Sequence, residues 1–361
     1  MIFSKEEYLS RLSKVTDVME HKNIDVIIIT DPSNMNYLTG YDGWSFYVPQ
    51  GIIVALDMDE PIWFGRRQDS KGAKVTTYLQ DKNIIYYSED LIQSPPTHPY
   101  DFVSSFIHEN NWAKKNIGVE MDAYYYTAEN HYRLTSTCPN VNFSDATLLV
   151  NWIRLIKSEN EITYMKEGAK LVQAGMKTAY ENIKPGVKQS YVAGKIQNSL
   201  IGGNEEINIG GEYPGLTTIL ASGVSASASH LTPKDDLFNN NEGTIIELAG
   251  VKNRYHCPLS RTVYCGKPDL KTSDTMKITN EGVEKAISVT KPGNTANDVA
   301  VAFWSVLENY GIEKDSRLGY AIGVGYPPDW GEHTMSIRKN DMTVLQPNVT
   351  FHMIAGMWMD T

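Results

Sequence analysis

The sequence has no long hydrophobic run, and we expect no signal peptide in its first residues. No stretch approaches the about 20 consecutive apolar residues that a membrane-spanning helix requires. The first residues, MIFSKEEYLSRLSK, are amphipathic and partly acidic, unlike a signal peptide. We therefore expect no membrane partner and a cytoplasmic location.

Cysteine and positive charge are also scarce. The chain of 361 residues has three cysteines, Cys138, Cys257 and Cys265, and none is in a Cys-x-x-Cys spacing. An odd number of isolated cysteines predicts reduced thiols rather than a disulfide framework. The formal net charge is −10, whereas nucleic acids are bound through basic surfaces. The composition therefore argues against a nucleic-acid partner.

The first part of the chain alternates between strand-like and helix-like segments. Polar, helix-compatible segments such as 98–113 separate short runs rich in β-branched and apolar residues. These runs are 25–30, 51–57, 83–88 and 116–122. Such alternation is typical of an α/β domain with a largely parallel sheet. We expect this domain to span residues 1–153.

The second part of the chain groups its strands and helices and contains an internal repeat. Lys-Pro-Gly starts at Lys184 and again at Lys291, an offset of 107 residues, and the same offset matches Val192 with Val299. Each copy is expected to have a long helix, the Lys-Pro-Gly stop and a second helix. This pattern predicts an α+β domain over residues 154–361, with duplicated halves around a cleft.

Five segments of the second part carry distinctive motifs: RLIKSENEI, ASHLTP, IELAGVKNRYHCPLSRT, RLGYAIGVGYPPDWGEHTMSI and LQPNVTFHMIAGMWM. Together they resemble the pita-bread family of creatinase, prolidase, aminopeptidase P and methionine aminopeptidase. The resemblance implies an α/β N-terminal domain of the creatinase type, Rossmann-like or ribonuclease-H-like, at residues 1–153. It implies a pita-bread catalytic domain with internal duplication at residues 154–361, in which we expect the family's usual final strand to be missing.

The metallopeptidases of this family hold two metal ions with two Asp, one His and two Glu. The resemblance places four of these ligand positions on Glu247, Pro258, Tyr320 and Ile354, and the fifth beyond Thr361. Proline and isoleucine have no ligand atom and a neutral phenol is a poor ligand, whereas a divalent pair needs several anionic oxygens. The sequence therefore predicts an enzyme that uses no metal and no other cofactor.

Within the family, the chain resembles the ectoine hydrolases more closely. The segments that carry this likeness are GYDGWSFYVPQ, IIELAGVKNRYHCPLSRT, GYPPDWGEHTMSIR and TFHMIAGMWMD. The resemblance implies metal-independent hydrolysis of a C–N bond in a cyclic amidine, with ectoine converted to N-acetyl-2,4-diaminobutyrate. Glu247, a carboxylate in an apolar strand, would act as nucleophile or as general base. His230 matches the catalytic histidine of creatinase and would carry the proton.

The remaining candidates of the second domain are assigned to substrate binding, and each has a structural alternative. These candidates are Tyr320, Asp329, Trp330, Glu332 and Arg261. The aromatic side chains could pack, the two acids could neutralise an arginine, and Arg261 could orient Glu247 or bind the substrate carboxylate. His352 alternates with apolar neighbours and is expected to be a core histidine.

An aromatic loop, TGYDGWSFYVPQG at residues 39–51, stands out in the first domain. By itself it suggests an interface. Members of the family are dimers in which the N-terminal domain of one subunit approaches the cleft of the other. The resemblance therefore implies a homodimer in which Trp44 or Tyr47 lies near the substrate bound by the other subunit.

Two other functions fit the same resemblance. A metal-dependent Xaa-Pro dipeptidase or aminopeptidase would require bound Mn, Co or Zn. A catalytically inactive, peptide-binding pita-bread module, as in chromatin chaperones, would need neither Glu247 nor His230. Such modules carry long acidic tails, and no such tail is seen in this sequence.

Overall fold

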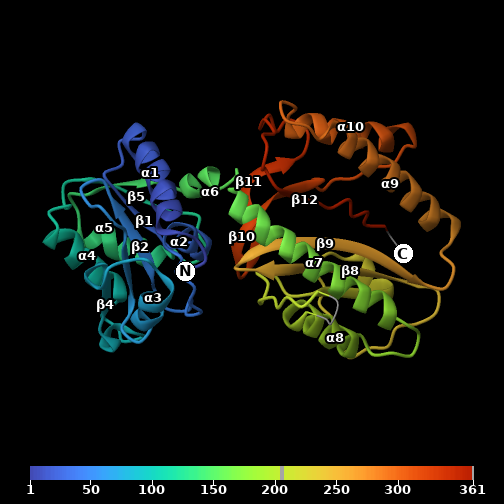
Figure 1. Cartoon of the computed structure of the whole chain (residues 1–361), viewed down its shortest axis with the longest axis horizontal. Helices are drawn as coiled ribbons and strands as arrows, with labels where there is room; N and C mark the ends of the chain where they lie inside the picture. Colours follow the sequence, from blue (N-terminus) through green and yellow to red (C-terminus); the bar gives the residue numbers. More distant parts are fainter. Residues whose placement is uncertain (204–206, 360–361) are drawn as a thin grey trace. The chain divides into compact units, whose positions relative to one another are not determined.

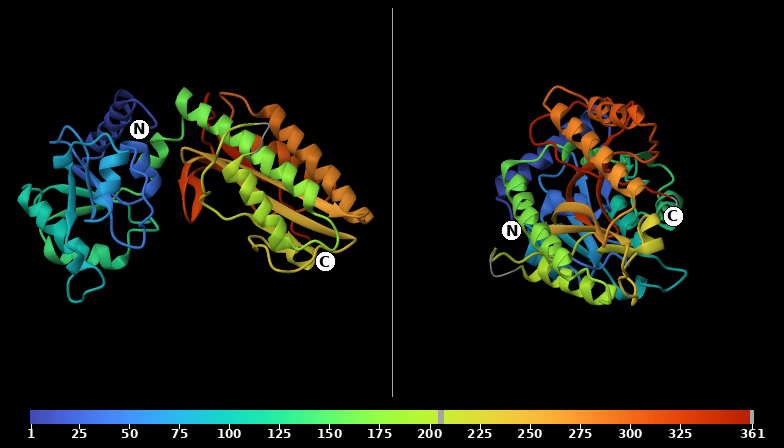
Figure 2. Two further views of the ribbon diagram at one scale, coloured as in Figure 1. Left: turned by 60° about the horizontal axis from the view of Figure 1, so that its bottom comes forward. Right: turned by 90° about the vertical axis from the view of Figure 1, so that its right-hand side faces the viewer.

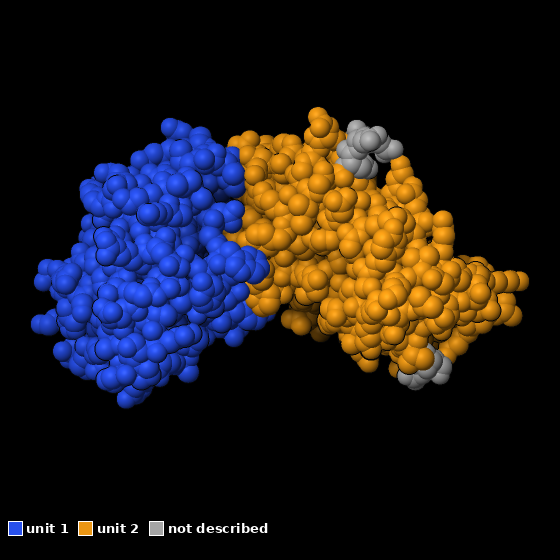
Figure 3. Space-filling view, turned by 90° about the horizontal axis from the view of Figure 1, so that it is seen from below, with its two compact units in different colours: residues 1–154 blue, residues 155–361 orange. Residues whose placement is uncertain are grey.

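The chain folds into two compact units, Met1–Arg154 and Leu155–Thr361 (Figure 3). The computed structural model describes residues 1–203 and 207–359. Each unit has its own sheet and its own hydrophobic core. Among the described residues, none of the helices combines the length and the apolar character that crossing a bilayer requires.

The first unit is an α/β domain built on a six-stranded sheet (Figure 1). Its strands are β1 (Val26–Ile29), β2 (Gly51–Ala55), β3 (Ile62–Arg66), β4 (Ile84–Tyr87), β5 (Asn116–Val119) and β6 (Asn142–Asp145). Its α-helices are α1 (Lys5–His21), α2 (Pro32–Thr39), α3 (Ser70–Thr76), α4 (Pro99–Glu109), α5 (Ala128–Thr137) and α6 (Leu149–Ile153). Two short 3-10 helices are η1 (Asp81–Asn83) and η2 (Glu89–Leu91).

The sheet of the first unit is mixed, which corrects the expectation of a largely parallel sheet. Its strand order is β4-β3-β2-β1-β5-β6. The pairs β3–β4, β1–β5 and β5–β6 are parallel, but β2 is antiparallel to both of its neighbours. Because β2 ends at Ala55 and β3 begins at Ile62, the connection is too short for a parallel crossover, which needs about a dozen residues or more.

The second unit has a sheet of antiparallel strands in the order β11-β10-β9-β8-β7, and β12 pairs with β10. The strands are β7 (Ile219–Ser222), β8 (Glu242–Lys252), β9 (Tyr255–Cys265), β10 (Gly319–Tyr326), β11 (Asp329–Ile337) and β12 (Phe351–Met353). The helices are α7 (Glu159–Asn182), α8 (Gln189–Gly202), α9 (Leu270–Val289) and α10 (Ala296–Asn309), with the 3-10 helix η3 (Gly223–Ser227).

Two hydrophobic cores support the two halves of this sheet. α7 and α8 lie side by side and pack on β8 (Figures 1 and 2), and their apolar side chains form one core with Ile246 and Leu248 of β8. α9 and α10 pack on each other, and Phe303 of α10 contributes to the other core with Met335 of β11. Since side chains alternate along a strand, Glu247 faces the side of the sheet opposite to α7 and α8.

The two halves of the second unit repeat the same backbone connections, as the Lys-Pro-Gly repeat predicts. The β-bridge between Lys188 and Leu237 has its counterpart, 107 residues further on, in the bridge between Thr295 and Val344. Hydrogen bonds at the two Lys-Pro-Gly turns show the same offset. They run from the N–H of Gly186 to the carbonyl of Phe238 and from the N–H of Gly293 to the carbonyl of Leu345. The duplication therefore holds in three dimensions.

β8 and β9 form a long hairpin that contains both Glu247 and Pro258. Every residue of β9 pairs with β8, including Pro258 with Ala249 and Ser260 with Glu247. On its other side, within the described residues, β9 pairs with β10 only at Tyr255. At Pro258 the strand is therefore an edge strand, the setting in which proline is tolerated. Directly opposite residues share a face, so Ser260 lies beside Glu247.

Candidate active site

Glu247 lies at the middle of β8 with a nearly buried carboxylate. The residue is 7% exposed. Burial and the negative charge of Asp329 raise the pKa of Glu247 to about 7. Within the described residues, the one recorded polar contact of the carboxylate is with His352, at 3.9 Å. The ionised form of Glu247 is therefore poorly compensated, and a bound cation would stabilise it.

His352 of β12 faces Glu247. Its Nδ1 lies 3.9 Å from Oε1 of Glu247 and 3.3 Å from the hydroxyl oxygen of Tyr320. Burial, assisted by the positive charge of Arg261, lowers the pKa of His352 to about 4. At neutral pH the imidazole is uncharged, so it cannot neutralise Glu247, but it can accept a proton.

His352 is buried as expected, but it belongs to the candidate site rather than to the apolar core. A signal for this position was present in the sequence. The resemblance places Ile354 at one of the family's ligand positions, and residues two apart in an extended strand point to the same face. A histidine at position 352 was therefore placed to face the site.

Tyr320 of β10 connects His352 with β11. Its hydroxyl accepts a hydrogen bond of 2.8 Å from the indole N–H of Trp330, and its ring meets that of His352 edge to face, with centroids 5.6 Å apart. Burial raises the pKa of Tyr320 above its usual value, so the phenol keeps its proton. Trp330 is fully buried. We therefore reassign Trp330 from substrate binding to the positioning of Tyr320.

Asp329, at the start of β11, supplies a second carboxylate. Its Oδ1 accepts hydrogen bonds from the backbone N–H groups of Trp330 and Gly331, at 2.6 and 2.9 Å, and its Oδ2 lies 2.9 Å from Nε2 of His333. Burial alone would raise the pKa of Asp329, but these hydrogen bonds hold it below its usual value. At neutral pH the site thus combines an ionised carboxylate, that of Asp329, with a carboxyl group that is about half ionised, that of Glu247.

Glu332, also on β11, is held in a buried ion pair. Its Oε2 accepts a hydrogen bond of 2.7 Å from Nζ of Lys157, and both side chains are 1% exposed. The same ammonium group donates to the carbonyl of Leu155 at 3.0 Å. The charge of Glu332 is thus offset by a lysine of the protein itself, so we reassign Glu332 from substrate binding to structure.

Arg261 does not orient Glu247. The register of the hairpin pairs Arg261 with Ile246, whose side chain is in the core beneath α7 and α8. Arg261 is exposed, and its guanidinium donates to the carbonyl of its neighbour Ser260 at 2.7 Å. Because Glu247 and Arg261 lie on opposite faces, the pairing expected from the sequence is not formed.

His230 follows η3 in a turn and is exposed, with a left-handed φ of 63°. The structure records no interaction between His230 and Glu247 within the described residues. Its role as proton carrier therefore has no geometric support beyond the resemblance, and His352 is the histidine that the structure places at the carboxylate.

The aromatic loop of the first unit exposes the two residues assigned to it. Trp44 is 58% exposed and Tyr47 is 70% exposed. Phe46 between them contacts both Trp44 and Tyr125, with ring centroids 5.5 and 5.2 Å apart. The loop is thus anchored by one aromatic side chain and presents two others to the surface.

The donor atoms at the family's metal-ligand positions do not fit a pair of divalent ions. Glu247, Pro258, Tyr320 and Ile354 supply one carboxylate and one phenol, whereas such a pair needs several anionic oxygens. In residues 1–203 and 207–359, no group of three or more His, Cys, Asp or Glu side chains is placed to hold a metal ion. The dinuclear centre that the resemblance to metallopeptidases implies is therefore not matched by these residues.

Comparison with known proteins defines the family. Residues 11–156 match the creatinase/prolidase N-terminal domain, and residues 163–361 match metallopeptidase family M24. The chain is 43% identical to the ectoine hydrolase of Halomonas elongata, over 99% of this chain and 91% of that protein. It is 22% identical to the Xaa-Pro dipeptidase of Pyrococcus furiosus, over 96% of this chain and 92% of that protein.

A solved structure shows the same fold. The prolidase of Pyrococcus horikoshii OT3 superimposes with a TM-score of 0.75 at 20% identity, covering 95% of this chain and 89% of that one. The chain belongs to metallopeptidase family M24 and carries a creatinase/prolidase N-terminal domain. The family and the two-domain pita-bread fold expected from the sequence are therefore confirmed, and the protein is a hydrolase of this family.

Proposed function

We propose that this hydrolase opens a cyclic amidine by breaking a C–N bond without a metal, and that its substrate is ectoine, which becomes N-acetyl-2,4-diaminobutyrate. The observation that carries the proposal is Glu247, a buried carboxylate whose pKa is raised to about 7 and whose recorded neighbour, His352, is uncharged. The similarity to the relative named ectoine hydrolase supports the choice of substrate.

Electrostatics explain why a cationic ring suits this site. The ring of ectoine is an amidinium at neutral pH, and its N–H groups can donate charge-assisted hydrogen bonds to Glu247 and Asp329. The cation also offsets the two causes of the raised pKa of Glu247, which are burial and the charge of Asp329. Binding of the substrate would thus convert Glu247 into its reactive, ionised form.

The chemistry then proceeds at the carbon between the two ring nitrogens. Glu247 either attacks this carbon and forms a covalent intermediate, which water then hydrolyses, or removes a proton from a water molecule that attacks the carbon directly. In both routes one ring C–N bond breaks, the leaving nitrogen takes up a proton, and the water consumed in the reaction supplies, in net, that proton and the oxygen of the acetyl group. His352, at 3.9 Å from Glu247, can receive and return that proton, and His230 is the alternative carrier that the resemblance supplies.

We propose a reaction without metal because of the residues that stand at the family's metal-ligand positions. Glu247 is the one carboxylate at the four family ligand positions within the chain, and a lone carboxylate does not offset the charge of two divalent ions. An amidinium, which carries a single positive charge, is matched in charge by that same carboxylate.

The proposal includes a cytoplasmic homodimer in which the aromatic loop approaches the substrate of the other subunit. Exposure of Trp44 and Tyr47 supports it, since a cation can stack on either ring. In that arrangement Trp44→Ala raises the KM for ectoine about tenfold and leaves kcat nearly unchanged. An unchanged KM would argue against the loop's role.

A metal-dependent Xaa-Pro dipeptidase or aminopeptidase is the second candidate. The match to metallopeptidase family M24 and the similarity to Xaa-Pro dipeptidases favour it. It requires ligands that Pro258 and Ile354 cannot supply. Metal content and substrate choice therefore separate the two candidates.

The test incubates the purified protein with ectoine, with and without a chelator, and follows the ring-opened product by mass spectrometry. We expect equal rates in both conditions and a kcat/KM that rises with pH towards about 7, where Glu247 ionises. Glu247→Gln should lower turnover by at least about 10³-fold. Glu242→Gln, at the start of the same strand, is the matched control and should leave turnover unchanged.

Absence of ring opening, combined with cleavage of an Xaa-Pro dipeptide after addition of Mn²⁺, would refute the proposal in favour of the second candidate. Full activity of Glu247→Gln would refute the assigned role of this carboxylate even if ectoine is the substrate.

A further inference from the structure

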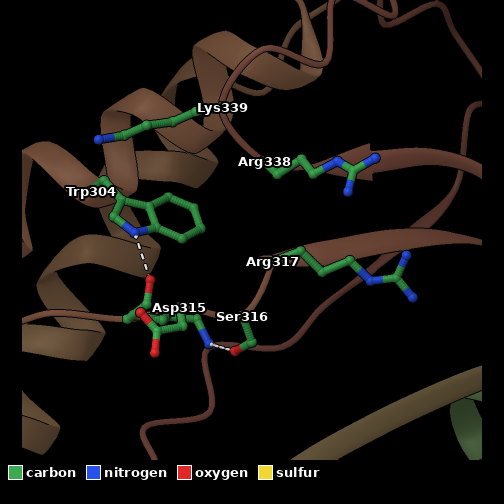
Figure 4. A pocket seen from close by; sticks show the side chains of 7 residues that line it. Trp304, Asp315, Ser316, Arg317, Arg338 and Lys339 are labelled. Atoms are coloured by element: carbon green, nitrogen blue, oxygen red, sulfur yellow. Dashed lines mark hydrogen bonds between the residues drawn. The ribbon is translucent and has the colours of Figure 1, made fainter.

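A basic cavity lies beside the candidate site. It is found where β10 begins and β11 ends, at the end of this hairpin opposite to its turn. It has a volume of about 680 Å³, and its lining includes Lys314, Arg317, Arg338 and Lys339 with one acidic side chain, Asp315 (Figure 4). The chain as a whole has a formal net charge of −10. The lining of this cavity, with four cationic groups and one acidic one, thus contrasts with the negative net charge of the chain, and it suits an anion.

Two of the four cationic side chains already interact with other groups of the protein. Lys339 pairs with Glu308 at 2.7 Å. Lys314 donates to the hydroxyl of Ser316 at 2.6 Å and to the carbonyl of Gly356 at 2.7 Å, and burial lowers its pKa to about 8. Both ammonium groups are held by internal partners, which leaves the two arginines as candidates for binding an anion.

Within residues 1–203 and 207–359, neither arginine has a recorded ion pair with a carboxylate. Arg317 donates to the hydroxyl of Ser336 at 2.9 Å, a neutral acceptor that uses one of its five N–H groups. For the side chain of Arg338, no hydrogen bond or ion pair is recorded within the described residues, and the side chain is exposed. Both guanidinium groups therefore retain donors for a ligand.

The two arginines are neighbours across the hairpin. Gly319 of β10 pairs with Ile337 of β11, and the N–H of Leu318 donates to the carbonyl of Ile337 at 2.8 Å, so residues 317 and 338 follow at the same end. Figure 4 shows both guanidinium groups extending in the same direction, while Lys339 extends the opposite way. Two cationic groups that extend the same way at one end of the hairpin can be bridged by a single anion.

Arg317 also reaches the candidate active site. Its guanidinium carbon lies 4.5 Å from the centroid of the Tyr320 ring. The hydroxyl of Tyr320 is 3.3 Å from His352, which is 3.9 Å from Glu247. Tyr320 and His352 therefore connect Arg317 with the reacting carboxylate through successive contacts.

We infer that Arg317 and Arg338 bind the carboxylate of the substrate and select cyclic amidines that carry one. This inference rests on the proposed amidine hydrolysis. Guanidinium groups bind a carboxylate through paired, charge-assisted hydrogen bonds. The amidinium end of the zwitterion then faces Glu247 and Asp329, and the carboxylate end faces the two arginines, so the substrate is oriented by both of its charges.

The kinetic test compares ectoine with 2-methyl-1,4,5,6-tetrahydropyrimidine, the same ring without its carboxylate. Arg317→Gln should lower kcat/KM for ectoine about 10- to 100-fold, mostly through KM, and change kcat/KM for the decarboxylated ring less than about twofold. Arg338→Gln should have a smaller effect of the same kind. Lys339→Gln, whose ammonium is held by Glu308, is the matched control and should leave both substrates unaffected.

A second test needs no turnover. Phenylglyoxal modifies accessible arginines, and mass spectrometry identifies the modified peptides. Pipecolate, a six-membered ring with an ammonium and a carboxylate, should protect Arg317 and Arg338, whereas piperidine, the same ring without the carboxylate, should not.

The two tests separate the possible failures. If neither amidine is hydrolysed but pipecolate protects the arginines, the proposed reaction is wrong and the carboxylate subsite stands. If Arg317→Gln lowers hydrolysis of both rings equally, or if pipecolate protects no better than piperidine, the subsite is refuted even when ectoine is the substrate.

Discussion

Two buried glutamates of the second unit lie in electrostatically opposite regions. On β11, Glu332 is paired at 2.7 Å with the equally buried ammonium of Lys157. On β8, Glu247 faces His352, which burial keeps uncharged. The first region neutralises its carboxylate with the protein's own cation. The region around Glu247 has no such cation within the described residues, so a cationic ligand would stabilise its ionised carboxylate.

A raised pKa alone does not separate these cases. Glu120 of the first unit is also buried, and burial raises its pKa to about 7. However, its carboxylate accepts hydrogen bonds from the backbone N–H groups of Thr30 and Asp31 and from the side chain of Asn34, at 2.6 to 2.8 Å. What distinguishes Glu247 is a raised pKa combined with the lack of recorded hydrogen-bond donors among the described residues.

The largest effect on stability is expected at Glu332. Glu332→Gln removes the carboxylate that pairs with the buried ammonium of Lys157, and Lys157→Met removes the ammonium that pairs with the buried carboxylate of Glu332. Breaking one side of a buried ion pair destabilises by about 3–5 kcal/mol. We expect a loss of this size in the free energy of unfolding for each single variant, measured by urea denaturation.

The double variant Lys157→Met/Glu332→Met should recover most of that loss, because neither member of the ion pair is left behind without the other. The exposed pair of Lys339 and Glu308 is the control: Lys339→Gln should change the unfolding free energy by about 0.5 kcal/mol or less. If Glu332→Gln were as mild as that control, the contrast between the two glutamates would not hold.

The fold was largely predictable because its signals are local. Runs of β-branched residues identified four strands of the first unit, and Lys-Pro-Gly identified the duplication. β3 and β6 were missed for physical reasons. β6 (Asn142–Asp145) is a short, partly exposed edge strand with polar residues. β3 (Ile62–Arg66) is a short apolar run with a glycine, which periodicity alone cannot assign to a strand.

Glu247→Gln should stabilise the protein, in contrast to Glu332→Gln. The pKa of Glu247 in the folded state is about 7, above the usual carboxyl value of 4.5, so folding favours the protonated form. As pH rises from about 4.5 to 7, the wild-type protein loses about 3 kcal/mol through this group. A neutral glutamine avoids that loss.

The expected result is a pH-dependent difference in the free energy of unfolding. Glu247→Gln and wild type should be equally stable near pH 4, and the variant should be more stable by about 3 kcal/mol above pH 7. Urea denaturation across this range measures the difference. A variant that is destabilised at pH 8 would mean that the protein, and not a ligand, compensates the charge of Glu247.

The candidate site was less predictable because its contacts are long-range. Glu247 stood out because an acid in an apolar strand is locally anomalous. Glu332 pairs with Lys157, which is 175 residues away along the sequence. A local sequence pattern therefore could not predict this pair. The role of His352 depends on the pairing of β12 with β10, which places it opposite Tyr320, and the exposure of Arg261 depends on the register of the β8–β9 hairpin.

The smallest effect is expected at Arg261. Its side chain is exposed on the face opposite to Glu247, and its recorded hydrogen bond is to the carbonyl of Ser260. Arg261→Gln should change the unfolding free energy by about 0.5 kcal/mol or less and kcat/KM by less than about twofold. Its positive charge contributes to the lowered pKa of His352, so the variant should raise that pKa slightly, measurable by NMR titration of the imidazole. A loss of activity above about tenfold would instead place Arg261 at the carboxylate, and Glu247 would then be a paired acid like Glu332.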